Sequence, residues 1–129
     1  MGPGEIVTRF NEAINRGDLV GLGALMTDDH TFTDAAGAQV VGKSNCVAAW
    51  RGFFEEFPDY RNHFSEVIPR DDRVVVIGYS TCSVAVLDGP ALWTAQVAAG
   101  KVARWQVYED TPALRAELGI PTHSGAPPL

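Results

Sequence analysis

The second half of the chain alternates extended apolar runs with turn-forming segments, and this alternation limits the fold more than any other feature. Four runs rich in β-branched and aromatic residues have the composition of strands, and they cover residues 60–68, 73–87, 91–97 and 101–108. The segments between them contain Pro, Asp or Gly, and they cover residues 69–72, 88–89 and 99–100. Strands joined by such short turns pair with their neighbours, so the sequence predicts an antiparallel meander.

Helices are predicted before this meander. Ile6, Phe10 and Ile14 recur at intervals of four residues, so they share one face of a helix that ends at Gly17. Asp18 can cap a second, short helix rich in leucine. Both segments therefore have an apolar face that must be buried.

A third helix is predicted from an N-cap at Ser44 to a stop at Pro58. Its apolar face consists of Val47, Trp50, Phe54 and Phe57. A short strand at 31–34 and a return strand at 39–41 precede it, and a last short helix begins at Pro112. Helices followed by antiparallel strands predict an α+β fold, in which three helices pack against a curved sheet of four to six strands. Such a sheet encloses a cone with an apolar interior.

Size and charge narrow the possible functions. The 129 residues are enough for one domain, expected at 1–120, with a flexible tail at 121–129 that has little to bury. The net charge of −6 and the lack of a Lys/Arg stripe argue against nucleic-acid binding. The apolar runs are too short to cross a membrane and no signal-peptide pattern opens the chain, so a cytoplasmic protein is expected.

No cofactor is expected from the sequence. The His and Cys residues lack metal-ligand spacing, and the glycines do not form a phosphate-binding loop. Cys46 and Cys82 stand alone, without a CxxC pair, so both are expected to be free thiols.

Asp34 is the first candidate for chemistry. It ends a predicted strand beside the Ala35-Ala36-Gly37 turn. Beside an apolar wall it could be a general base, because burial raises the pKa of a carboxyl group. The alternative is a turn residue whose side chain accepts hydrogen bonds from the next backbone amides. The residues alone leave both interpretations open.

Glu109 and Asp110 are the second candidates, since an acidic pair ends the last strand. Neighbouring strand residues point to opposite faces, so a regular strand puts Glu109 on the face of Trp105. A bulge near the strand end would put Asp110 there instead. Asp110 or Thr111 could also cap the helix that begins at Pro112.

Several other side chains are candidates for lining a pocket in such a cone. Aromatic candidates are Trp50, Phe54, Tyr79, Trp93 and Tyr108. His63 lies in a predicted strand and could relay protons, although a solvent-facing histidine is the alternative.

The order of these pieces resembles the SnoaL-like branch of the nuclear transport factor two-like superfamily, which includes polyketide cyclases, ketosteroid isomerases and limonene epoxide hydrolases. The resemblance spans about residues 6–119, and it rests on Arg16-Gly17-Asp18, Thr31-Phe32-Thr33-Asp34, Phe57-Pro58-Asp59 and the closing strand and helix. It implies a cone-shaped, curved antiparallel sheet wrapped around three N-terminal helices. It also implies a homodimer formed through the sheet.

SnoaL-type polyketide cyclases place a catalytic Asp between the last strand and a helix that ends in Gln-Leu-Gly. Glu117-Leu118-Gly119 matches that helix end here. Counting back from it reaches Asp110, whereas counting forward from Trp105 reaches Glu109. The helix register is the longer match, so the resemblance favours Asp110.

Ketosteroid isomerases resemble this chain at Asp34, where their proton-shuttling Asp lies. Their oxyanion donors fall on Phe10 and near Leu92 or Trp93, so both donors are missing. Limonene epoxide hydrolases use an Arg-x-Asp that falls near Tyr79-Ser80-Thr81, which cannot replace it. Steroid isomerisation and that particular hydrolysis are therefore disfavoured.

The leading hypothesis is a cofactor-free enzyme that moves a proton on an apolar cyclic or polyketide-like substrate, in an aldol-type cyclisation or an isomerisation. Asp110 and Asp34 are the predicted catalytic residues. The predicted substrate-binding residues are Phe10, Trp50, Phe54, His63, Tyr79, Trp93, Gln106 and Tyr108. A non-catalytic ligand-binding or dimerisation module is one alternative. An epoxide hydrolase that pairs Asp34 with Asp110 or Asp59 is another.

Overall fold

The computed structural model describes residues 1–121. Its helices are α1 (Pro3–Arg16), α2 (Leu19–Ala24), α3 (Lys43–Glu56), the 3₁₀ turn η1 (Ala85–Leu87) and α4 (Pro112–Glu117). Its strands are β1 (Met26–Thr33), β2 (Gln39–Val41), β3 (Arg61–Arg70), β4 (Arg73–Thr81), β5 (Gly89–Ala98) and β6 (Lys101–Glu109). The predicted α+β fold is confirmed. Of the predicted tail at 121–129, all but Pro121 lies outside the described residues.

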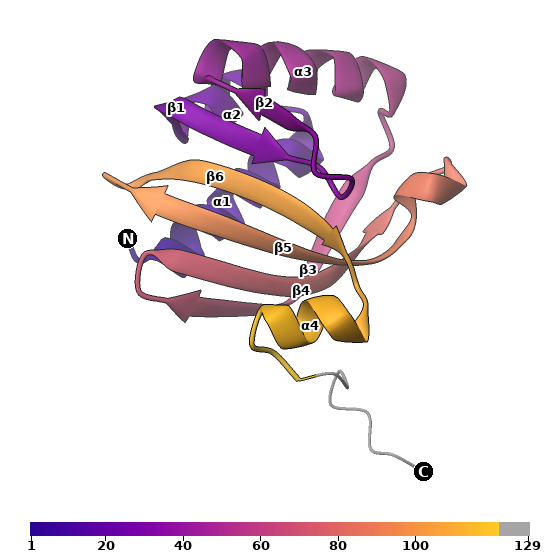
Figure 1. The fold of residues 1–129 in the computed structure, drawn as a ribbon. Helices are drawn as coiled ribbons and strands as arrows, with labels where there is room; N and C mark the ends of the chain where they lie inside the picture. Colours follow the sequence, from indigo (N-terminus) through magenta and orange to yellow (C-terminus); the bar gives the residue numbers. More distant parts are fainter. Residues whose placement is uncertain (122–129) are drawn as a thin grey trace.

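The strands form one curved, six-stranded sheet in the order β2-β1-β6-β5-β4-β3 (Figure 1). The meander from β3 to β6 is antiparallel throughout, as predicted. The pair β1–β6 is parallel, so the sheet is not purely antiparallel. These two strands are far apart in the sequence, and the short-turn argument that predicts antiparallel neighbours does not apply to them.

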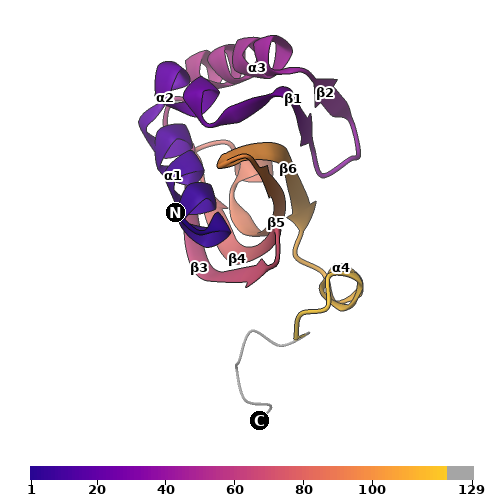
Figure 2. The ribbon, with the colours of Figure 1, turned by 90° about the vertical axis from the view of Figure 1, so that its left-hand side faces the viewer.

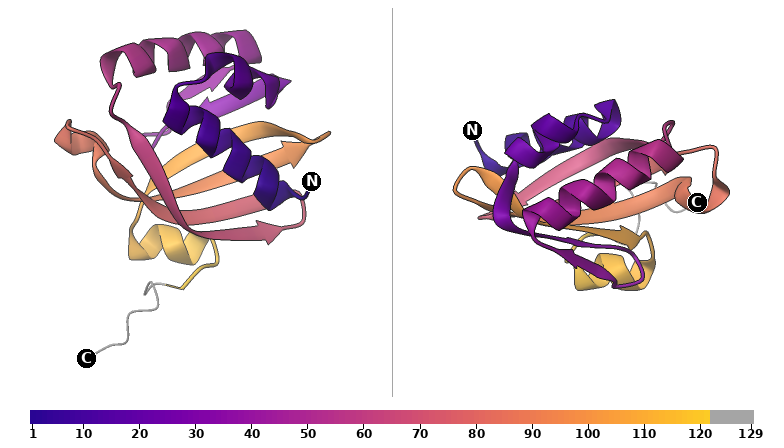
Figure 3. Two further views of the ribbon diagram at one scale, coloured as in Figure 1. Left: turned by 180° about the vertical axis from the view of Figure 1, so that it is seen from behind. Right: turned by 90° about the horizontal axis from the view of Figure 1, so that it is seen from above.

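The two faces of the sheet carry different elements (Figure 2). Helices α1, α2 and α3 lie against the inner, concave face, whereas α4 lies on the outer face, as the view from behind also shows (Figure 3). The main core joins the apolar faces of α1 and α3 to inward-facing strand residues such as Val76, Trp93 and Trp105. A smaller outer cluster joins Leu118 and Ile120 to Val75, Ile77 and Leu92.

Local sequence explains the first helices. Pro3 occupies the first turn of α1, where its missing N–H costs nothing. Gly17 ends α1 with a left-handed φ of 62°, as expected of a glycine there. Asp18 caps α2 as predicted, since its Oδ1 accepts a hydrogen bond from the Gly21 amide at 2.9 Å. Helix α3 begins at Lys43 rather than after Ser44; Gly42 is its N-cap with a φ of 96°.

The predicted strand at 73–87 is too long, because β4 ends at Thr81. After Thr81, backbone amides donate their hydrogen bonds to aspartate side chains and not to a neighbouring strand. The Cys82 amide donates to Asp88 Oδ1 at 3.0 Å, and the Ser83 amide donates to Asp59 Oδ2 at 2.8 Å. Asp88 and Gly89 are consequently not a tight hairpin; they lead from η1 into β5. The predicted Ala99-Gly100 turn is confirmed, with φ values of 52° and 75°.

Candidate functional site

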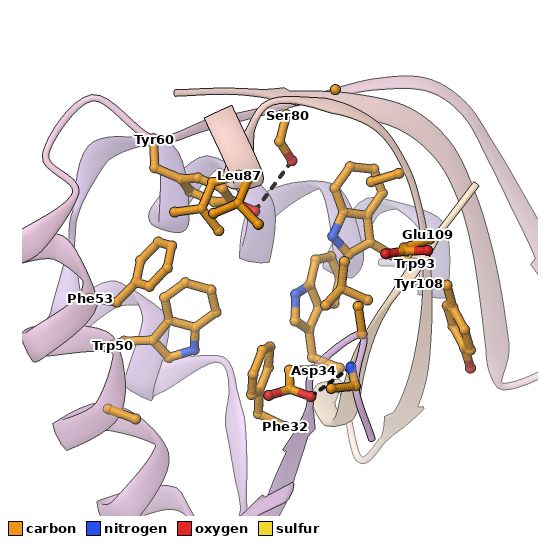
Figure 4. Close-up of a pocket in the computed structure, with 18 of the residues that line it drawn as sticks. Phe32, Asp34, Trp50, Phe53, Tyr60, Ser80, Leu87, Trp93, Tyr108 and Glu109 are labelled. Carbon is orange, nitrogen blue, oxygen red and sulfur yellow. Dashed lines mark hydrogen bonds between the residues drawn. The ribbon is translucent and has the colours of Figure 1, made fainter. Parts of the chain in front are cut away.

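A cavity of about 540 Å³ lies between α3, the inner face of the sheet and the segment that joins β4 to β5. Figure 4 shows Trp50 and Phe53 on one side of it and Trp93 on the other. Tyr60 and Ser80 lie at one end, and Asp34 lies at the opposite end in this view. Helix, sheet and loop thus enclose a space large enough for a small organic molecule.

The aromatic wall follows from helical and strand periodicity. Trp50 and Phe53 are three residues apart on α3, and their rings meet edge to face at 5.6 Å. Phe53 in turn meets Tyr60 at 4.8 Å and nearly perpendicular. Trp93 and Trp105 point inward from β5 and β6, and each is only 1% exposed. The cavity therefore presents rigid ring surface that favours apolar, ring-containing ligands.

A polar chain crosses one end of the cavity, and sequence reasoning missed it. Ser80 Oγ donates to Asn62 Oδ1 at 2.7 Å and lies 3.3 Å from the Tyr60 hydroxyl. Because Asn62 Oδ1 can only accept, the Ser80 proton points to it, and the Tyr60 hydroxyl is left to donate to Ser80. Burial raises the pKa of Tyr60, so this phenol stays protonated.

Two further asparagines hold this chain in place. The Asn62 amide donates to Asn15 Oδ1 at 2.8 Å, and the Asn62 carbonyl accepts from Asn15 at 2.8 Å and from Asn11 at 3.2 Å. Helix α1 thereby fixes the start of β3. Within residues 1–121, the buried Asn62 Nδ2 and Asn11 Oδ1 have no hydrogen-bond partner.

Asp34 is a turn residue that also lies at the cavity. Its Oδ1 accepts hydrogen bonds from the Ala36 and Ala38 amides, both at 2.9 Å, which makes it a turn residue. It also lines the cavity. No described residue donates a hydrogen bond to its Oδ2, so that oxygen can accept one from a ligand.

At the end of β6, Glu109 and not Asp110 lines the cavity. The pairing of β5 with β6 is unbroken from Ala95–Trp105 to Ala91–Glu109, so the strand alternates regularly up to its end. The bulge in this pair lies before Trp105, between Gln96 and Val97. The expectation that Asp110 faces the cavity is therefore corrected: no bulge exists where one was needed.

Asp110 instead forms a buried ion pair on the outer side. Its two oxygens accept from Arg115 Nε at 2.6 Å and Nη2 at 2.7 Å. The Arg115 side chain is 4% exposed, and its Nη1 donates to the Pro121 carbonyl at 2.9 Å. This pairing raises the pKa of Arg115. Thr111 takes the alternative capping role, accepting from the Leu114 amide at 3.2 Å.

The remaining predicted residues divide between the cavity and other places. Trp50 and Trp93 line the cavity as expected. Phe54 stacks on Trp50 at 5.5 Å but lies behind it, outside the lining. Phe10 is fully buried in the core and packs on Trp105 at 5.0 Å, so it offers no surface to a ligand.

The other four predicted binding residues do not point into the cavity. His63 is exposed and stacks on Tyr79 at 4.7 Å, on the surface of the β3–β4 pair. Gln106 lies on the outer face in the β6 alternation. Tyr108 borders the cavity, but its ring points away from it (Figure 4), and its hydroxyl lies 2.9 Å from Thr94 Oγ1. Strand alternation explains the positions of Gln106 and Tyr108 on β6, since Trp105, Val107 and Glu109 point inward.

The acid pairs required by the epoxide hydrolase hypothesis do not form. Asp59 is exposed, and interactions with the Ser83 side chain, the Ser83 amide and the Cys82 thiol lower the pKa of its carboxyl group. Like Asp110, it lies outside the cavity lining, so neither residue joins Asp34 there. Among residues 1–121, no group of His, Cys, Asp and Glu could hold a metal ion. In the same part of the chain no helix has the length and apolar character needed to span a bilayer. Cys46 and Cys82 are free thiols, as expected.

Comparison with known proteins identifies the family and the fold. The family model of the SnoaL-like domain matches residues 7–108. A comparison with curated protein sequences finds no match.

Solved structures share the fold at low sequence identity. A candidate polyketide cyclase from Sinorhizobium meliloti has a TM-score of 0.73 and 17% identity, covering 80% of this chain and 93% of its own. An epoxide hydrolase of the LEH-like type from M. tuberculosis has a TM-score of 0.73 and 14% identity, covering 82% and 80%. A protein from Catenulispora acidiphila with a ketosteroid isomerase-like fold, solved with trimethylamine, has a TM-score of 0.66 and 20% identity, covering 92% and 95%.

Proposed function

Because the chain belongs to the SnoaL-like domain family, we propose that it binds an apolar, ring-containing carbonyl compound and moves a proton on it without a cofactor. The observation that carries this proposal is the aromatic cavity, which is lined by a hydrogen-bonding pair and by a carboxylate. The likeness to solved structures supports the fold, and the choice of chemistry comes from the residues in the cavity.

The Tyr60–Ser80 pair is suited to hold the substrate oxygen. When a carbonyl oxygen approaches, the Tyr60 hydroxyl can turn its proton from Ser80 to the ligand. Ser80 keeps its bond to Asn62, so the phenol gives up its bond to Ser80 when it donates to the ligand. A donor in an apolar cavity stabilises the negative charge that develops on an enolate oxygen.

Asp34 is suited to be the base. Two backbone amides fix its Oδ1, so the carboxylate is oriented before the substrate arrives. Its Oδ2 removes a proton from a carbon next to the carbonyl, and the bonding electrons move into the enolate. Return of that proton to another carbon gives an isomer. Alternatively, the enolate attacks a second carbonyl of the same molecule and closes a ring, and the alkoxide that forms takes the proton back from Asp34. In this proposal Asp34 acts without the predicted partner Asp110, which is engaged with Arg115.

Deuterium exchange tests the proton transfer without knowledge of the natural substrate. 2-Tetralone in D₂O is a suitable probe, and NMR follows the loss of the signals next to its carbonyl. We expect the protein to accelerate this exchange and Asp34→Asn to reduce the acceleration by about 10²-fold or more. Asp28→Asn is the matched control, because Asp28 is an exposed acid on β1, the strand that Asp34 follows, and lies outside the cavity.

The results also separate the two main hypotheses. An unchanged rate in Asp34→Asn refutes its role as base. Binding of 2-tetralone without any accelerated exchange favours the non-catalytic ligand-binding module. Tyr60→Phe should slow exchange more than it weakens binding, because its hydroxyl acts on the developing charge.

We also propose that two chains pair through the outer face of the sheet, as the family resemblance implies. Helix α4 covers only the part of this face at Val75, Ile77 and Leu92. Beside it Arg73, Gln96 and Arg104 lie opposite one another on three neighbouring strands, along a groove of about 300 Å³. Light scattering after size exclusion should give twice the chain mass, and Arg104→Glu should lower it. A single-chain mass at about 100 μM would refute the dimer.

A further inference from the structure

The cavity lining points to the charge of the molecule that the site accepts. Asp34, Asp88 and Glu109 line it, and none of the described lining residues is lysine, arginine or histidine. We propose that the site accepts ring compounds that are uncharged or carry an ammonium group, and excludes those that carry a carboxylate. This inference rests on the proposed small-molecule site and adds the charge class of its ligand.

The three carboxylates come from separate elements of the fold. Asp34 follows β1, Asp88 precedes β5 and Glu109 ends β6. None of them forms an ion pair with a described basic residue, in contrast to Asp110, whose charge is balanced by Arg115. Their combined field inside and at the mouth of the cavity is therefore negative, and the low-polarity walls weaken its screening.

The aromatic wall favours the same sign of charge. Trp50 and Phe53 face Trp93 across the cavity (Figure 4), so a ligand between them meets ring surfaces. The face of an aromatic ring is negative and attracts an ammonium group that comes within about 6 Å. The same ring face offers a carboxylate no favourable interaction that would compensate for its lost hydration.

The polar end of the cavity does not compensate an anion. Its side chains are the hydroxyls of Tyr60 and Ser80, and Ser80 already donates to Asn62. One neutral donor remains, from Tyr60. A carboxylate placed there would lack a cation and be left with unsatisfied lone pairs, which is costly in a buried site. A neutral carbonyl or hydroxyl needs only that one donor.

Titration calorimetry with three probes on one ring system tests the inference: 2-naphthylmethylamine, 2-naphthylmethanol and 2-naphthoate at pH 7. We expect the amine to bind about tenfold more tightly than the alcohol, and the carboxylate about tenfold more weakly. The advantage of the amine should shrink as the salt concentration rises.

Glu109→Gln and Asp88→Asn should each reduce the preference for the amine by about threefold, because both acids are exposed and partly screened. Asp28→Asn, outside the cavity, should leave the preference unchanged. Equal affinity for all three probes, or tightest binding of the carboxylate, would overturn the charge inference and leave the small-molecule site standing. If none of the probes binds, the small-molecule site falls, and the charge inference falls with it.

Discussion

Removal of the Asp110 carboxylate should lower the free energy of unfolding without changing the cavity. Asp110→Ala leaves the Arg115 guanidinium buried without the carboxylate that accepts two of its hydrogen bonds at 2.6 and 2.7 Å. Loss of one partner of such a buried pair typically costs 3–5 kcal/mol, because the remaining charge stays desolvated. The Asp110 side chain is 14% exposed, so water reaches one edge of the pair and the lower end of that range applies.

We therefore expect a loss of about 3 kcal/mol in the free energy of unfolding, which lowers the Tm by roughly 10 °C in a domain of this size. Urea denaturation followed by circular dichroism measures the first quantity, and a thermal scan measures the second. Arg115→Met in the Asp110→Ala background should recover most of the loss, because it removes the buried charge and keeps the apolar volume.

Ligand binding in the cavity is the control for this stability measurement. Affinity for the neutral probe 2-naphthylmethanol should be the same in Asp110→Ala and the parent protein, measured below the transition temperature of both. A stability change below about 1 kcal/mol, together with lost probe binding, would refute the structural role of the pair. That outcome would support Asp110 as a cavity residue, as the family resemblance implies.

Three further predictions concern groups away from this pair. Burial lowers the pKa of His30 below 6.5, and its Nε2 has no hydrogen-bond partner in the described part of the chain. Stability should therefore be full above pH 6.5 and fall as the pH drops toward the folded pKa. The urea midpoint should show this pH dependence, and His30→Gln should flatten it. Asp59→Ala should lower the protection factor of the Ser83 amide against hydrogen exchange, and acidification of the parent protein should do the same only once the pH falls below the lowered pKa of Asp59. Cys46 lines the cavity, and burial raises the pKa of its thiol. Iodoacetamide should therefore label Cys82 before Cys46, as followed by mass spectrometry. Bound 2-naphthylmethanol should slow the labelling of Cys46.

Periodicity predicts most of the fold because it reports which face each residue buries. The spacing of Ile6, Phe10 and Ile14 gives α1, and the turn sequences give the meander. The same rule identifies Glu109 as the inward acid, since β6 is regular from Trp105 onward. Counting back from the helix end selects Asp110 instead. That choice is wrong for the inward acid, because it requires a bulge that this part of the strand does not contain.

The Tyr60–Ser80–Asn62 chain could not be predicted, because it depends on strand register. Asn62 pairs with Ser80 in the β3–β4 ladder, and an irregularity between Phe64 and Glu66 separates this pairing from the hairpin turn. A shift of one residue at a bulge moves every later side chain to the other face. Nothing in the local sequence fixes where the extra residue is placed, so the partner of Asn62 stays undetermined until the sheet is built.

Asp34 shows why turn and catalytic interpretations need not compete. A carboxylate has two oxygens, and the turn uses Oδ1 alone. The hydrogen bonds to that oxygen remove the rotational freedom that a catalytic carboxylate would otherwise lose on binding its substrate. They also hold Oδ2 in one direction, so the turn itself orients the proposed base. Asp34→Glu should therefore impair proton exchange more than its unchanged charge suggests, because the longer side chain cannot satisfy the Ala36 and Ala38 amides from the same position.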